Sequence, residues 1–243
     1  MNKQFTCLMY HEIVSPKKTK FSVDPSMFET QMRALREAGV TSLVLDSKAQ
    51  STSIYRCLLT FDDGHVSNLQ AARVMYELGL IGYFYLLKDN SLEQSDYLKE
   101  GDIKEMAALG HQFGVHGKNH GWWTKKTSER LVSELRETKD WIEQLTGKAV
   151  ITCSAPGGFI DQRTLNCIRN RIPELKYIRT SHYGYNNECD TVLRSIGVKS
   201  CYSSDKVLHI AQNEWLTMQK IMAYYYAKEA FKPLYYWAHN KFK

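Results

Sequence analysis

Leu58-Leu59-Thr60-Phe61-Asp62-Asp63-Gly64-His65 is the stretch around which the rest of the chain is organised. A short apolar run ends abruptly in two adjacent carboxylates and a glycine, as a buried strand does when it delivers charged groups to the rim of a site. Because neighbouring carboxylates repel each other, a cationic group is expected beside Asp62 and Asp63.

A second polar stretch, His116-Gly117-Lys118-Asn119-His120, supplies the expected partner. Two imidazoles four residues apart fall on one face of a helical turn and can bind one metal ion. With one of the carboxylates they make three protein ligands, and a zinc-like ion with three protein ligands keeps a fourth position open for water. This pattern is typical of a catalytic site, and it leaves one aspartate free to act as a base.

Length and hydropathy predict one domain. The chain has 243 residues with 43% hydrophobic content, enough to bury one sizeable core. The N-terminal apolar run, residues 7–10, is too short for a signal peptide, and the longest uncharged apolar stretch, residues 79–87, is far shorter than the roughly 20 residues of a membrane-spanning helix. A cytoplasmic protein, soluble or peripheral to the inner membrane, is therefore expected.

Cysteine spacing and charge exclude further classes. The six cysteines form no Cys-x-x-Cys pair, so we predict buried thiols that are neither bridges nor ligands. The net charge is +6, and the segment 220–243 holds five lysines and one glutamate, so most of the excess lies in this tail. A nucleic-acid partner is therefore not expected. The cysteines are Cys7, Cys57, Cys153, Cys167, Cys189 and Cys201.

Strands and helices are predicted to alternate, which indicates a parallel sheet, and their number indicates a barrel. One domain over residues 1–219, followed by a helical tail over 220–243, is expected. The predicted strands are 7–10, 41–45, 57–61, 81–87, 112–115, 150–153, 177–180 and 193–198. The predicted helices are 25–38 (capped by Asp24), 68–78, a short one capped by Asp102, one from 127 or 128 to 147, 164–171, and one from about 205.

Three polar groups directly follow predicted strands: Asp62-Asp63, His116 and Pro156-Gly157. In a (β/α) barrel the active site is built from loops at the carboxyl ends of the strands. The three groups are therefore expected to meet on one rim.

With these residues in place, the chain resembles the polysaccharide deacetylases of carbohydrate esterase family 4, the NodB-homology domain, from about residue 6 to 198. Thr60-Phe61-Asp62-Asp63-Gly64 matches the first family motif, and His116 to His120 matches the second except at Gly117. The resemblance implies a distorted or partial (β/α) barrel, Asp62 as general base, and Asp63, His116 and His120 as ligands of one divalent metal ion, usually zinc. Tyr10-His11-Glu12 is similar to the branch found in bacterial surface-polysaccharide clusters.

The later family motifs are altered. The pattern Arg-x-Pro-x-Gly becomes Ser154-Ala155-Pro156-Gly157-Gly158, so the arginine that orients the catalytic aspartate is missing there, and Arg179 or Arg194 is the candidate substitute. The Asp-x-x-x-Trp motif is not evident. Leu208-His209 matches the last motif only superficially, because its surroundings have helical spacing. The general acid is left open among three histidines: His182, His11 and His209.

The resemblance implies metal-assisted hydrolysis of an N-acetyl group on an amino sugar or glycan, in lipopolysaccharide or capsule biosynthesis. Asp62 would take a proton from water, and Pro156-Gly157 is either an oxyanion and substrate site or a plain tight turn. Trp122-Trp123 either stacks on a sugar or packs beneath the rim. The alternatives are a non-catalytic, metal-containing carbohydrate-binding protein and a hydrolase of another amide or ester.

The tail from Lys220 carries eight of the 29 aromatic residues together with most of the net positive charge. Tyrosine, tryptophan and lysine favour an anionic membrane surface, so peripheral membrane contact is one expectation. Packing against the barrel, or a subunit contact, is the other, because Pro233 is expected to interrupt a long amphipathic helix. The aromatic residues are Tyr224, Tyr225, Tyr226, Phe231, Tyr235, Tyr236, Trp237 and Phe242.

Overall fold

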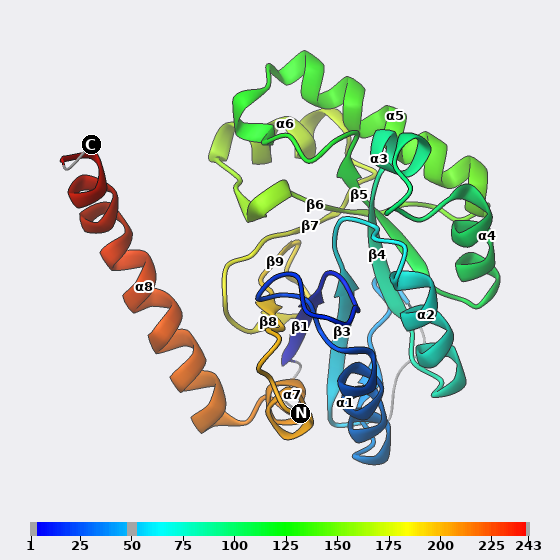
Figure 1. Ribbon diagram of the computed structural model, residues 1–243. Coiled ribbons are helices and arrows are strands. Elements are labelled where there is room, and N and C mark those ends of the chain that lie inside the picture. Colours follow the sequence, from blue (N-terminus) through cyan, green and yellow to red (C-terminus); the bar gives the residue numbers. More distant parts are fainter. Residues whose placement is uncertain (1–3, 48–52, 242–243) are drawn as a thin grey trace.

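The sheet is a nearly closed, barrel-like array of parallel strands with helices around its outside (Figure 1). This computed structural model describes residues 4–47 and 53–241, with side chains up to residue 230. The strand order is β10-β1-β3-β4-β5-β6-β7-β9, and these neighbours pair in parallel. Their bounds are β1 (Gln4–Tyr10), β3 (Arg56–Phe61), β4 (Gly82–Leu87), β5 (Gln112–Gly117), β6 (Thr152–Ser154), β7 (Tyr177–Arg179), β9 (Val192–Leu193) and β10 (Ile196–Gly197).

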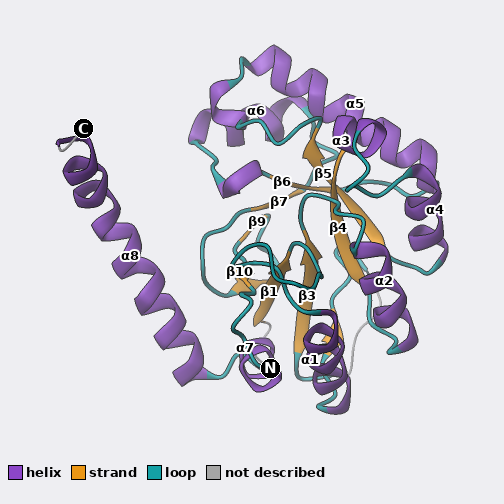
Figure 2. Ribbon diagram, in the orientation of Figure 1, coloured by secondary structure: helices purple, strands orange, loops and turns teal. Residues whose placement is uncertain are grey.

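Two further short strands and the helices complete the fold (Figure 2). β2 (Thr41–Ser42) pairs in parallel with β3, and β8 (Asn186–Asn187) pairs antiparallel with β1. The helices are α1 (Pro25–Glu37), α2 (Asn68–Glu77), α3 (Lys88–Glu93), α4 (Glu100–Ala108), α5 (Ser128–Thr146), α6 (Gln162–Arg171), α7 (Ser204–Ala211) and α8 (Trp215–Lys241), with single 3-10 turns at Trp123–Lys125 and Pro156–Gly158.

The pleat of each strand sorts its side chains between two cores. On β3, Leu59 and Phe61 face the outer core under the helices, whereas Leu58 faces the inner core. On β4, Phe84 lies in the outer core and Tyr85 in the inner one. Successive side chains of a strand point to opposite faces, so apolar runs without alternation are what a sheet covered on both sides requires.

Local signals set several helix ends as predicted. Asp24 accepts a hydrogen bond from Ser26 N at 3.0 Å at the start of α1. Thr127 does the same for Arg130 N at the start of α5, and Gly147, with φ of 65°, ends that helix in the left-handed conformation.

Other predicted elements were wrong in their bounds. The strand predicted at 41–45 ends at Ser42, since Leu45 N donates to the side chain of Tyr83 instead of a neighbouring strand. The strand predicted at 193–198 is split into β9 and β10, because Arg194 N donates to the Asn186 side chain. Asp102 does not cap α4. It lies in the first turn and accepts from Lys99 N at 2.8 Å, so the helix begins earlier.

The C-terminal region and the cysteines also needed correction. The single helix predicted from about 205 is two helices, α7 and α8, and the predicted domain boundary at 219/220 falls inside α8. α8 continues through Pro233, since a proline removes one helical hydrogen bond without obliging the helix to end. All six cysteines are free as predicted, but Cys189 and Cys201 are exposed. Within the described ranges, none of the helices combines the length and the apolar content needed to cross a bilayer.

Candidate active site

Four strands of the sheet deliver polar residues to one rim of the barrel. β3 leads into Asp62 and Asp63, β5 carries His116, β6 leads into the 156–158 turn, and β7 carries Arg179. Asp63 adopts the left-handed conformation with φ of 71°, which an aspartate tolerates better than most residues. The chain therefore turns sharply at the strand end, and Asp62 and Asp63 face different partners.

Asp63, His116 and His120 form a cluster of the kind that holds a metal ion, with one ligand atom from each lying within 4.8 Å of the others. Asp63 Oδ1 lies 3.2 Å from His116 Nε2 and 3.4 Å from His120 Nε2. Ligand atoms about 2.0–2.2 Å from a tetrahedral ion are about 3.3–3.6 Å apart, so these separations suit such an ion.

The hydrogen bonding of His116 adds independent evidence. Its Nδ1 lies 2.7 Å from the carbonyl oxygen of Ser154, so Nδ1 carries the hydrogen that is donated. In the neutral ring Nε2 then directs a lone pair at Asp63 Oδ1, a buried atom without a hydrogen-bond partner among the described residues. Two lone pairs at this distance repel unless a proton or a metal ion lies between them. The donor set of one carboxylate and two imidazoles fits a divalent ion such as zinc.

The pKa shifts of His116 and Asp63 point the same way, whereas burial and the charge of His116 lower the pKa of His120. Burial alone would lower the pKa of His116, but contact with Asp63 and the charge of Asp62 raise it above its ordinary value. Burial alone would raise the pKa of Asp63, but His116, and more weakly His11 and His120, hold it well below its ordinary value. The cluster therefore stabilises positive charge at its centre.

The two histidines come together in a different way from the one predicted. A helical turn was expected, but His116 belongs to strand β5 and His120 lies in the loop that follows. Gly117, with φ of 110°, adopts a backbone conformation that residues with a Cβ atom rarely reach, and this turns the loop back toward the strand end. The ring centroids of the two histidines are 5.3 Å apart. The motif has a glycine where its family pattern has a hydroxyl residue.

Arg179 substitutes in space for the arginine that the turn at 154–158 lacks. Its Nη2 donates hydrogen bonds to Asp62 Oδ2 and to Ser154 Oγ, and its Nη1 donates to Ser195 Oγ at 2.8 Å. The guanidinium carbon lies 5.1 Å from the centroid of Tyr85, and the charge of Asp62 helps to raise the pKa of Arg179 against the effect of burial. Of the two predicted substitutes, Arg179 is therefore the one that contacts Asp62.

Arg194, the other candidate, is exposed and turned away. Its Nη1 donates to the carbonyl oxygen of Tyr185 at 3.3 Å. The hydrogen bonds from Arg179 to Ser154 and Ser195 were not predicted. The sequence does show Ser154 at the position of the missing arginine.

A pocket of about 440 Å³ opens at this rim. Asp62, Asp63, His120 and Arg179 line it. Asp62 Oδ1 is buried and has no hydrogen-bond partner among the described residues, so this oxygen, unlike the one bound by Arg179, is available to accept a proton.

The turn after β6 brings backbone into the pocket. Gly157 lines the pocket, while Pro156 is buried and, as a proline, has no N–H to donate. Gly157 and Gly158 have φ of 66° and 72°, and a Cβ atom on Gly158 would lie 1.8 Å from Ser181 Oγ. Of the two residues predicted as the oxyanion site, only Gly157 could supply a donor.

The three candidate acids are separated by the structure. His11 lines the pocket, stacks on Phe21 with centroids 5.0 Å apart, and has a buried Nδ1 without a hydrogen-bond partner among the described residues. His182 is exposed, and its Nδ1 lies 3.1 Å from Tyr225 Oη. His209 lies on α7, with its Nδ1 3.5 Å from Glu214 Oε2, and lines a different pocket. Of the three histidines, only His11 lines the pocket that contains Asp63 and His120, and its role as the acid stays a prediction.

Trp122 and Trp123 lie in different environments, one at the surface and one buried. Trp123 is buried beneath the rim, whereas Trp122 is partly exposed beside Phe159, with ring centroids 5.0 Å apart. The 224–229 segment of α8, which was assigned to the tail, also lines the pocket.

Comparisons of the sequence with known proteins find polysaccharide deacetylases. A family model described as polysaccharide deacetylase matches residues 49–171, just over half of the chain. YxkH of Bacillus subtilis (strain 168), named as a candidate polysaccharide deacetylase, is 27% identical over 165 residues, which cover 65% of this chain and 58% of YxkH.

Solved structures share the fold. A deacetylase of Streptococcus pyogenes, PplD, solved in complex with acetate, superposes with a TM-score of 0.78 at 19% identity, covering 86% of this chain and 98% of that one. BC0361, a polysaccharide deacetylase from Bacillus cereus, gives a TM-score of 0.76 at 23% identity, covering 86% and 69% of the two chains. At these identities the likeness concerns the fold alone.

Proposed function

This chain belongs to the polysaccharide deacetylase family, and from that premise we propose that it is a metal-dependent hydrolase that removes an N-acetyl group from an amino sugar or glycan. One observation carries the proposal: Asp63, His116 and His120 form a cluster beside the pocket that Asp62 lines, and Arg179 holds one oxygen of Asp62. Acetate bound to a protein of the same fold is the product that such a reaction would release.

Asp63, His116 and His120 would hold the divalent ion, for which zinc is our proposal. When bound, such an ion supplies Lewis-acid chemistry, polarising the acetyl carbonyl and lowering the pKa of water. Ser154 fixes the tautomer of His116 so that Nε2 faces the ion.

Asp62 is proposed as the general base. Its Oδ1 is the carboxylate oxygen without a partner, and it takes the proton from the attacking water. Arg179 binds Oδ2 and so orients the carboxylate. A base whose second oxygen is fixed loses little conformational freedom when it accepts a proton.

Gly157 and His11 complete the proposed reaction. The N–H of Gly157 would donate to the oxyanion that forms when the carbonyl is attacked. His11 would then protonate the departing amine, because it lies in the pocket and has an unpartnered ring nitrogen. A place in surface-polysaccharide biosynthesis and a cytoplasmic location are part of this proposal and rest on the sequence.

The test separates the two adjacent aspartates. Asp62→Asn is expected to keep the metal but lose about 10²- to 10⁴-fold in the rate of acetate release from an N-acetylglucosamine oligomer, as loss of a general base does. Asp63→Asn is expected to lose both metal and activity. Metal analysis of the purified proteins and an acetate assay measure the two effects.

Asp140→Asn on the exposed face of α5 is the matched control, with both metal and activity expected unchanged. Acetate release by Asp62→Asn at the parent rate would exclude this residue as the base. Release from O-acetyl esters but not from N-acetyl sugars would favour the alternative hydrolase, and metal binding without turnover of either substrate would favour a carbohydrate-binding protein.

A further inference from the structure

The pocket has a second wall that takes no part in the proposed chemistry. Beyond the strand ends it is lined by the loop that follows β1, by the segment around Lys199, and by α8. The side chains that matter here are Lys20, Lys199, Lys228, Glu229, Tyr224 and Tyr225.

Direct contacts bring these three segments together. Ser200 N donates to the carbonyl oxygen of Lys20 at 2.8 Å, so the backbones that carry Lys20 and Lys199 lie side by side. Lys199 Nζ lies 5.0 Å from the ring centroid of Tyr224 on α8. The wall is therefore a built feature of the fold, made by segments far apart in the sequence.

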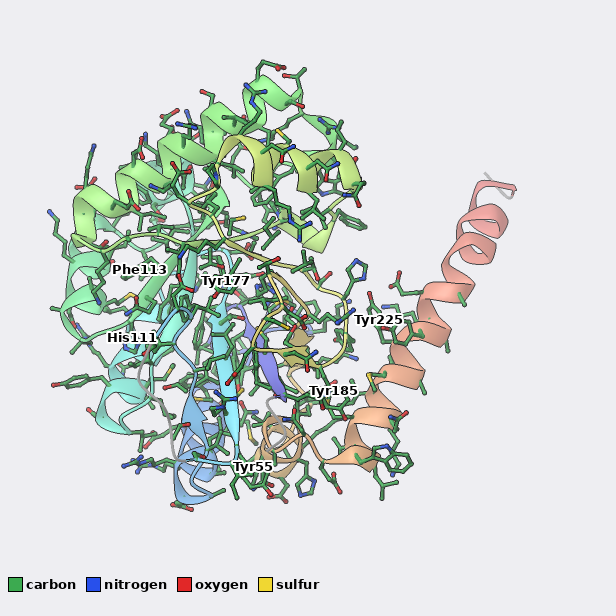
Figure 3. All side chains as sticks on the ribbon, turned by 180° about the vertical axis from the view of Figure 1, so that it is seen from behind. Tyr55, His111, Phe113, Tyr177, Tyr185 and Tyr225 are labelled. Atoms are coloured by element: carbon green, nitrogen blue, oxygen red, sulfur yellow. The ribbon has the colours of Figure 1, made fainter. Side chains whose placement is uncertain are left out.

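The first turns of α8 are packed onto the barrel. Tyr225 stacks on Tyr183 with centroids 4.4 Å apart and an interplanar angle of 11°, and Figure 3 shows it reaching from α8 toward the barrel. Met218 and Ile221 are buried, and Tyr226 Oη donates to the carbonyl oxygen of Tyr183 at 3.2 Å. This part of the helix is thus placed by side-chain packing.

The charge of this wall is unbalanced. Three lysines and one glutamate line it, outside the residues that hold the metal and the base. Tyr183 and Tyr225 stack on each other, whereas Tyr224 is exposed and offers the ring on which a sugar can pack. Lysine ammonium groups bind phosphate as point charges, and a phosphate with up to two negative charges is attracted more strongly than a carboxylate with one. The one arginine that lines the pocket is already bound to Asp62.

We propose that this wall is a subsite for a phosphate group carried by the acetylated sugar, so that the substrate is a sugar phosphate or diphosphate and not a finished neutral glycan. The inference deepens the proposed function and rests on it. The acetyl group would lie at Asp62 and the metal cluster, and the phosphate between Lys199 and Lys228. Such a substrate is made by reactions that attach a sugar to a phosphate carrier, so deacetylation would precede polymerisation.

The experiment compares binding and turnover in the full-length, metal-loaded protein. N-acetylglucosamine 1-phosphate and N-acetylglucosamine are measured by calorimetry and by acetate release. We expect the phosphorylated sugar to bind about tenfold or more tightly, since one charge-assisted hydrogen bond contributes about 1.5–3 kcal/mol. Raising the salt concentration is expected to weaken this preference because salt screens charge interactions.

Variants locate the effect. Lys199→Gln and Lys228→Gln are each expected to reduce the preference for the phosphorylated over the neutral sugar about tenfold. Lys104→Gln, which removes the same charge from the exposed face of α4, is the matched control and should leave the preference at the parent value. N-acetylmuramic acid, which bears a carboxylate instead of a phosphate, is the comparison ligand and is expected to bind more weakly than the sugar phosphate, because it carries a smaller negative charge.

The outcomes distinguish the subsite from the chemistry. Equal kcat/KM for neutral and phosphorylated sugars, or a preference that survives both lysine substitutions, would overturn the subsite and leave the deacetylase function standing. Lysine-dependent binding of the sugar phosphate without acetate release would support the subsite and overturn the function. A uridine diphosphate sugar and a short-chain prenyl diphosphate sugar, tested in parallel, identify which carrier supplies the phosphate.

Discussion

Asp62 and Arg179 are the two charged side chains buried most deeply at the strand ends, and each depends on the other. Their side chains are 7% and 2% exposed. A buried ion pair is weak evidence for stability, because desolvation offsets most of the attraction, but removing one partner leaves the other charge uncompensated. The arrangement therefore serves to fix the carboxylate more than to stabilise the fold.

At this scale we expect Arg179→Met to lower the free energy of unfolding by about 3–5 kcal/mol, since it leaves Asp62 buried without its cation. In an Asp62→Asn background the same substitution should cost about 2 kcal/mol less, because no charge is then stranded. Urea unfolding of the metal-free proteins measures all four members of this cycle. Equal costs in the two backgrounds would show that Arg179 acts by packing alone.

The two histidines proposed as metal ligands lie on segments that differ in rigidity. His116 is buried in β5 and hydrogen bonded to Ser154, whereas His120, in the following loop, has a side chain that is 47% exposed. A strand residue is fixed by its ladder, and a loop residue is held mainly by its own contacts. In the proposed metal site, His116 would therefore be positioned in advance by the sheet, and His120 would be the ligand able to adjust on binding an ion.

Most of the strands and helices could be predicted from the sequence. The failures concern features that local sequence signals do not determine. Apolar runs and turn residues located most strands and helices, and strand ends located Asp62, Asp63 and His116, because these signals are local. The prediction that a helical turn joins His116 to His120 was wrong, because a spacing of four residues also fits a loop that turns at a glycine. The Asp62 partner could only be narrowed to Arg179 or Arg194, because pairing across strands depends on register.

Another element-scale feature is His111, which joins α2 to the sheet (Figure 3). Its Nδ1 accepts from Gly82 N at 3.1 Å, and its Nε2 donates to the carbonyl oxygen of Ala72 at 2.9 Å. Burial, opposed by the bond to Ala72, lowers the pKa of His111 to about 4. The folded state therefore holds the neutral ring, and protonation at Nδ1 would break the bond from Gly82.

Because the folded pKa is the lower one, His111 favours folding fully above its unfolded pKa and loses this contribution as the pH falls from about 6.5 to 4. Going from pH 7.5 to 5 should lower the free energy of unfolding by about 2 kcal/mol through this group. His111→Gln should remove that part of the dependence. Denaturant unfolding of both proteins at the two pH values measures the difference, and parallel pH profiles would contradict the assignment.

At the scale of the whole molecule, α8 has two parts. Its first turns pack on the barrel and line the pocket, so Tyr225 follows the alternative in which the tail packs on the barrel. Figure 1 shows the rest of the helix continuing beside the barrel as a separate column. The side chains of Phe231, Tyr235, Tyr236, Trp237 and Phe242 lie outside those that the structure describes, so membrane contact through this segment stays a prediction.

Truncation after residue 230 tests the membrane contact without removing the packed turns. It deletes three of the five tail lysines, each contributing roughly 1 kcal/mol near anionic lipid, so we expect vesicle binding to weaken about 100-fold. Co-sedimentation with vesicles of phosphatidylserine and phosphatidylcholine measures this. Neutral vesicles are the control, and the same affinity for anionic vesicles before and after truncation would exclude the contact.

The serine at position 154 and the arginine at position 179 belong together, because the hydroxyl of one accepts from the guanidinium of the other beside Asp62. A motif search that scores each position separately finds the expected arginine missing at position 154 and does not consider position 179. Reading the two positions as a pair would instead count the arginine as present, supplied by the next strand of the sheet. Sequences with serine in the first place and no arginine on the next strand would then be the better candidates for lost turnover.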